Sequence, residues 1–131
     1  MLEIDAFFMN EDRHTNNIAV IYNEKTQKYE LSPFFDQGLC MFADINQDYP
    51  IDQSLEYCLE KIEAKPFSSD FDIQLDAAEE LYGIQIGFQF TFKDIQIYLQ
   101  KNSENYPREV IRRVEQLLRR QMRKYGYLMK K

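Results

Sequence analysis

The sequence predicts a single domain over residues 1–131 of the α+β class, mainly helical, with one β-hairpin near the N-terminus. Three observations lead to this prediction. Apolar residues recur at helical spacing after residue 52, and one short β-branched run precedes a polar turn close to the N-terminus. Only four glycines and four prolines occur in 131 residues, too few for a small all-β fold rich in turns. A hydrophobic share of 44% is enough for a core and excludes global disorder.

The N-terminal third combines a helix with the hairpin. Residues 1–9 are apolar on nearly every side, which predicts a buried helix without a solvated face. Residues 18–22 and 29–31 flank a polar turn and predict the two strands of the hairpin. Pro33 ends the second strand, because proline cannot donate to the ladder.

Four further helices are expected in the rest of the chain, with one extended segment among them. The first helix is capped by Asp52, has the apolar face Leu55, Leu59 and Ile62, and ends before Pro66; the second covers residues 70–82, begins with a Ser69/Asp72 capping box and ends at Gly83. The third begins with Thr91 and Asp94 and continues through Ile95, Tyr98 and Leu99. The last follows Pro107, and its apolar face consists of Val110, Ile111, Val114, Leu117, Leu118, Met122 and Tyr125. Residues 84–92 alternate apolar and polar, which predicts an extended segment with one buried face.

Charge is divided unevenly along the chain. The net charge is −6, but residues 107–131 hold nine Lys/Arg against two acids, while residues 1–106 hold seven against 20. We therefore expect no general nucleic-acid binder, although the basic final helix could contact an anion. The simpler interpretation of that helix is a solvated face, with cations near its C-terminus favoured by the helix dipole.

The cysteine usage and the lack of a signal-peptide pattern indicate a protein that is not exported from the cytoplasm. Cys40 and Cys58 form no CxxC pair, and with the single His14 they match no zinc motif, so we interpret them as reduced thiols. The sequence shows no transmembrane run and no basic stretch followed by an apolar signal core. We expect a cytoplasmic protein with no membrane partner.

A polar block at residues 10–17 is the strongest candidate for chemistry. Asp12 and Asn17 lie five residues apart between the predicted helix and the first strand. The start of one antiparallel strand lies beside the end of its partner, which places Asp36 near Asn17. An amide oxygen and a carboxylate suit Mg²⁺, and Asp12 beside them could receive a hydroxyl proton. Gly38 allows the chain to bend just after Asp36.

This arrangement resembles the catalytic half of a protein kinase, in which a loop Asp, an Asn five residues later and a following Asp-x-Gly carry phosphoryl transfer. The resemblance implies a fold like the C-terminal lobe (C-lobe) of a kinase, with the β-hairpin directly after the catalytic loop. The motif D-R-H-x-x-N and the stretches AFFMNEDRHTNN and YELSPFFDQG are similar to those of bacterial HipA-like Ser/Thr kinases, over roughly residues 1–42. The resemblance implies that Asp12 is the catalytic base and that Asn17 and Asp36 hold Mg²⁺ and, with it, ATP. It places His14 near the transferred phosphate and gives Asn10 a part in shaping the loop. For His14, a structural hydrogen-bonding role is an equal alternative, and Arg13 is expected to pair with a nearby acid.

The ATP-clamping N-lobe of such a kinase is missing from this sequence. Only 11 residues precede Asp12, and the four scattered glycines form no Gly-rich loop. The chain is then expected to be a cut fragment, one half of a split enzyme, or a degenerate lobe kept for binding. Its partners would be an N-lobe or other partner chain, or a second copy, besides a protein substrate and, by resemblance to toxin–antitoxin kinases, an antitoxin. The alternatives are a non-catalytic binding module and a regulator that uses the basic helix on nucleic acid.

Overall fold

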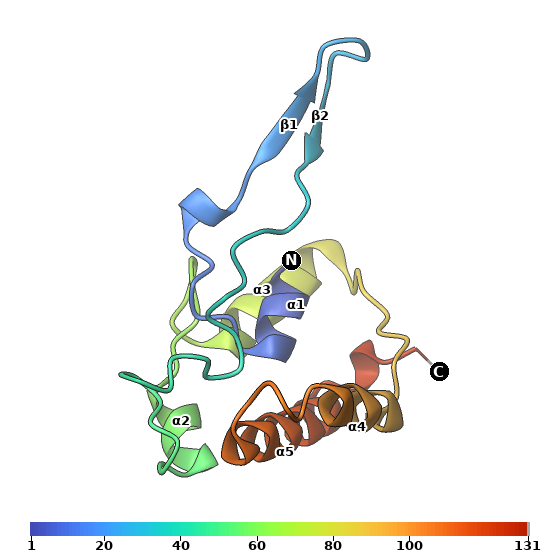
Figure 1. The fold of residues 1–131 in the computed structure, drawn as a ribbon. Helices are drawn as coiled ribbons and strands as arrows, with labels where there is room; N and C mark the ends of the chain where they lie inside the picture. The colour runs from blue at the N-terminus through green and yellow to red at the C-terminus, as the bar shows by residue number, and fades with distance from the viewer. Residues whose placement is uncertain (131) are drawn as a thin grey trace.

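The computed structural model describes residues 1–130 and is α+β and mostly helical, as the sequence predicts (Figure 1). The elements in chain order are α1 (Leu2–Phe8), the 3-10 turn η1 (Thr15–Asn17), β1 (Val20–Asn23), β2 (Lys28–Leu31), α2 (Leu55–Lys61), α3 (Phe71–Tyr82), α4 (Phe92–Lys101), α5 (Arg108–Lys124) and the 3-10 turn η2 (Gly126–Leu128). Within the described residues, no helix is long and apolar enough to cross a membrane.

The two strands form an antiparallel hairpin that projects from the helical body (Figure 1). Val20 lies opposite Leu31 and Tyr22 opposite Tyr29, so these four side chains share one face of the ribbon. All four are exposed, from 47% for Tyr22 to 73% for Tyr29. The hairpin therefore presents an uncovered apolar face, because nothing in the described chain packs on it.

The core lies where α1 meets α3 and α5. Phe7 of α1 and Leu117 of α5 are fully buried, and the Phe7 ring packs against Phe88 at a centroid distance of 4.6 Å. Gln121 of α5 donates to the carbonyls of Ala6 and Phe7, which ties the two helices together through their backbone. As expected, no residue of α1 is exposed.

Two helix starts differ from the predicted ones by one or two residues. Ser54 rather than Asp52 caps α2, accepting from the backbone N–H of Tyr57. The cap of α3 is Asp70, which accepts from two backbone N–H groups, so the predicted Ser69 capping box is wrong. Both N–H groups donate to Asp70 Oδ1, and the negative charge of this carboxylate also complements the helix dipole, which a serine cannot do. The Thr91/Asp94 capping box of α4 is confirmed.

The predicted extended segment 84–92 does not form a strand within a sheet. Its one ladder contact is a parallel bridge between Phe88 and Met129, and Phe92 already belongs to α4. Phe88 is buried, and Phe90 and Phe92 pack on the core, so the alternation predicts burial correctly from Ile86 onward, whereas Ile84 is 54% exposed. The segment lacks a neighbouring strand with which to build a ladder.

Candidate functional site

A buried ion pair organises the polar block 10–17. Arg13 is fully buried, and its Nε and Nη2 donate to the two carboxylate oxygens of Asp5 at 2.9 and 3.0 Å. Asn10 Nδ2 donates to Asp5 Oδ1 at 3.0 Å. The hydrogen bond to Asp5 raises the pKa of Arg13 above its ordinary value. A bidentate pair of this kind fixes the guanidinium plane, and with it the path of the loop that carries Arg13.

The remaining arm of Arg13 joins two distant parts of the chain. Nη1 donates to the carbonyl of Asn17 at 3.0 Å and to the carbonyl of Phe35 at 3.1 Å. Two acceptors of one nitrogen lie close together in space, so the backbone at Asn17 approaches the backbone just before Asp36. An antiparallel hairpin brings these two segments together at its base, and the hydrogen bonds of Arg13 keep them there.

The segment after Asp36 runs alongside the end of α1. Met41 N donates to the carbonyl of Phe8 at 2.9 Å, and Glu11 N donates to the carbonyl of Leu39 at 3.2 Å. Asp36 itself has φ +56°, a left-handed conformation that aspartate tolerates better than most residues. The loop carrying Asp12 and the segment carrying Asp36 are therefore held side by side by backbone hydrogen bonds.

Asp12 has a different environment from the buried Asp5. Its side chain is 24% exposed, with His14 Nε2 at 3.7 Å and Lys65 Nζ at 4.0 Å from Oδ1. Its backbone is fixed instead, since its N–H donates to Asn10 Oδ1 and its carbonyl accepts from Asn17 Nδ2 at 2.7 Å. A carboxylate on a fixed backbone with free acceptor capacity can receive a proton from a bound hydroxyl.

The two predicted metal ligands supply oxygen donors. Asn17 is buried, and because its Nδ2 is engaged by Asp12, Oδ1 is the atom available to a ligand. The Asp36 carboxylate is exposed. Among the described residues no cluster of three or more His, Cys, Asp or Glu side chains could hold a metal ion. The predicted site is of another kind, one amide and one carboxylate, which suits an ion that keeps several of its waters, such as Mg²⁺. A shared metal between Asn17 and Asp36 stays a prediction.

A hollow of about 270 Å³ opens beside Asp12. Its wall includes Asp12, Glu11, Asp48, Glu63, Lys61, Lys65, Tyr49 and Leu39. Burial raises the pKa of Glu11, although the hydrogen bond it accepts from Tyr49 acts in the opposite direction. The wall carries four acids against two lysines, and one of these lysines, Lys61, already pairs with Asp48 at 2.9 Å. An electronegative hollow next to the candidate base favours a substrate segment with positive charge.

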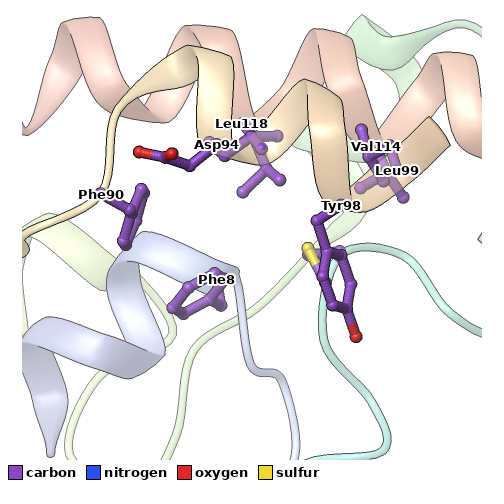
Figure 2. Close-up of a pocket in the computed structure, with 9 residues that line it drawn as sticks. Phe8, Phe90, Asp94, Tyr98, Leu99, Val114 and Leu118 are labelled. Atoms are coloured by element: carbon purple, nitrogen blue, oxygen red, sulfur yellow. The ribbon is translucent and has the colours of Figure 1, made fainter. Parts of the chain in front are cut away.

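A second cavity, of about 390 Å³, is almost entirely apolar (Figure 2). Phe8 and Phe90 face it from one side, and Tyr98, Leu99 and Val114 come from the α4–α5 pair. Asp94 is the one charged residue in its wall, and its carboxylate is already used by the Thr91 cap. The cavity could hold an apolar group, and its wall lacks the groups that phosphoryl transfer requires.

Three residues of the site were not singled out from the sequence. Asp5 stands in an apolar run, and an acid there is itself a signal for a buried partner, which proves to be the predicted acid partner of Arg13. Lys65 reaches Asp12 from 53 positions along the chain, a proximity that no local pattern indicates. Tyr49 reaches Glu11 from a loop without regular structure.

Comparison of the chain with protein-family models, with curated proteins and with solved structures finds no match. The assignment of a function therefore depends on the residues and geometry described above.

Proposed function

We propose that this chain is the base-carrying, metal-binding lobe of a HipA-like Ser/Thr kinase and works together with a separate nucleotide-clamping lobe. The reaction is transfer of the γ-phosphate of ATP to a protein hydroxyl. The observation that carries the proposal is the double hydrogen bond from Arg13 Nη1 to the carbonyls of Asn17 and Phe35. It supports a common site for the D-R-H-x-x-N loop and the Asp-x-Gly segment, which lie 19 residues apart in sequence between Asn17 and Asp36.

Each residue has a definite task in this proposal. Asp12 orients the acceptor hydroxyl and takes its proton as the oxygen attacks phosphorus. The Asn17 amide oxygen and the Asp36 carboxylate are the donors that hold Mg²⁺, whose charge offsets the negative charge of the phosphates when the nucleotide is bound. His14 and Lys65, at 3.7 and 4.0 Å from Asp12 Oδ1, provide positive charge or hydrogen bonds next to the base.

The exposed apolar surface near Asp36 supports contact with a nucleotide-clamping lobe. If a partner lobe covers this region, Phe34, Phe35, Leu39 and Met41 should be exposed in its absence. Phe34, Phe35 and Leu39 are 37%, 42% and 38% exposed on either side of Asp36, whereas Met41 is half-buried against the core. The β1–β2 hairpin, with its own exposed apolar face, begins three residues after Asn17 and ends five residues before Asp36. Uncovered apolar surface of this kind marks an interaction site. The same surface favours the second candidate, a non-catalytic module that binds an intact kinase.

A phosphate-transfer assay with and without a nucleotide-clamping lobe tests the proposal. The isolated chain should bind ATP weakly and incorporate no phosphate. With that lobe supplied, from the same gene or from another chain, Asp12→Asn should reduce transfer by about 10²- to 10⁴-fold, the usual contribution of a general base. Asp52→Asn, the same substitution at an exposed carboxylate outside this hollow, is the matched control and should remain active.

Two outcomes would contradict the kinase proposal. Transfer that persists in Asp12→Asn at the control level would remove the base from the mechanism. A full-length complex that binds its partner through the hairpin face and never transfers phosphate would instead favour the binding module.

A further inference from the structure

Helix α3 carries a second apolar stripe, separate from its buried face. Phe71 and Leu75 point into the core, while Ile73 and Leu81 are 63% and 73% exposed, with the exposed Ala77 between them. These three residues are four positions apart, so they form one stripe along the helix. A helix packed on one face only would normally place polar residues at such positions.

The charges beside this stripe have one sign. Within Phe71–Tyr82 there are four acids and no lysine or arginine. Asp72 pairs with Lys124, and Glu79 accepts a hydrogen bond from Tyr127. Asp76 and Glu80 have no lysine or arginine within 4 Å among the described residues, and they line one edge of the stripe.

We infer that the outer face of α3 docks a basic amphipathic helix of another protein. The stripe supplies three apolar contacts at i, i+4 and i+8, the pattern by which helices pack side by side. Asp76 and Glu80 complement lysine or arginine flanking the apolar seam of the partner, which gives the contact its orientation. The same negative edge disfavours nucleic acid and anionic lipid surfaces.

The strongly basic helix of this chain, α5, does not provide such a helix in a second copy, because it buries Leu117 and Leu118 in its own core and turns Arg119, Arg120 and Arg123 outward. Helix α4 exposes Ile97 and Tyr98, but it carries only two lysines and also Asp94, so it matches the acidic edge of α3 less well than a basic helix of another protein. This inference does not depend on the kinase proposal, because α3 contributes nothing to the candidate site.

Binding of synthetic peptides tests the inference. The probe is an 18-residue helical peptide with a leucine seam flanked by lysines, labelled for fluorescence anisotropy. One reference peptide has the same composition with the seam scrambled, and another has glutamates in place of the lysines. We expect the first peptide to bind at least roughly tenfold more tightly than the seam-scrambled reference, since one buried leucine-sized anchor is worth about that factor. It should also bind more tightly than the glutamate reference, whose charge repels Asp76 and Glu80.

Variants locate the binding to α3. The double variant Ile73→Gln, Leu81→Gln should weaken the lysine peptide at least roughly tenfold, and Asp76→Asn with Glu80→Gln should weaken it about threefold or more. All four positions are exposed, so circular dichroism should show an unchanged fold. The matched control is Ile97→Gln on α4, an isoleucine 43% exposed that lies outside the stripe.

The inference would be overturned by equal binding of the seam-scrambled peptide, which would indicate attraction to the net negative charge alone. Loss of binding in Ile97→Gln equal to that in the α3 double variant would overturn it as well. So would concentration-dependent self-association that the α3 double variant abolishes, because the occupant would then be a second copy.

Discussion

Replacing Arg13 tests the link that holds the candidate site together. In Arg13→Met the apolar stem stays while four hydrogen bonds disappear, two to the Asp5 carboxylate and two to the carbonyls of Asn17 and Phe35. Asp5 is 1% exposed and would keep one side-chain donor, Asn10. Removing one partner of a buried pair costs about 3–5 kcal/mol, because the other charge is left without its counterion.

The free energy of unfolding, measured in urea by circular dichroism, gives the magnitude. We expect a loss of about 4 kcal/mol for Arg13→Met, and about 2 kcal/mol for Arg13→Lys, which keeps the charge but cannot reach both Asp5 and the carbonyls. Asp5→Leu combined with Arg13→Met should be more stable than the sum of the single losses predicts, since neither charge is then buried alone. A loss below about 1 kcal/mol for Arg13→Met would refute the reasoning.

Two further predictions concern the polar contacts of Arg113 and Asp72. Arg113 is buried and donates to the carbonyls of Tyr49, Pro50 and Gln53. Arg113→Met should therefore lower the free energy of unfolding by about 2–4 kcal/mol in the same urea assay. The exposed Arg112 is the control, and Arg112→Met should change that free energy by less than about 0.5 kcal/mol. Burial of Asp72 would raise its pKa, but hydrogen bonds from Lys124 and Tyr125 outweigh burial and lower it below 3.8. A carboxylate whose pKa is lower in the folded state than in the unfolded state stabilises the fold at pH above its unfolded-state pKa, and this stabilisation is lost as the pH falls through the folded-state pKa. Asp72→Asn should therefore lower the melting temperature at pH 7 and lower it much less at pH near 3. Equal losses at the two pH values would contradict this prediction.

Much of the fold could be predicted because the core uses local periodicity. The spacing of Val114, Leu117 and Leu118 indicates α5 directly, and all three pack in or against the core. Periodicity alone could not tell whether residues 84–92 would find a strand partner, which depends on distant chain. It also could not show where α3 extends past the core: Tyr82, in the last turn of the helix, is 75% exposed.

The candidate site was predictable to a similar extent. The motif spacing and the hairpin brought the segments of Asn17 and Asp36 together correctly, since a short antiparallel pair leaves little freedom at its base. The group that holds them was not identified, because α1 carries two acids, Glu3 and Asp5, and the sequence does not say which group each of them pairs with. Lys65 and Tyr49 reach the site from loops, whose positions follow from packing of the whole chain.

Metal binding by the isolated chain tests the central claim most directly. Mn²⁺ in place of Mg²⁺ broadens the NMR signals of nuclei close to it, and we expect selective loss of the backbone signals of Asn17 and Asp36 on titration. Asp36→Asn and Asn17→Leu should each abolish the selective loss, whereas Asp52→Asn, an exposed carboxylate elsewhere, should leave it unchanged. Broadening that is spread over the acidic surface and unaffected by Asp36→Asn would contradict a metal site shared by these two residues.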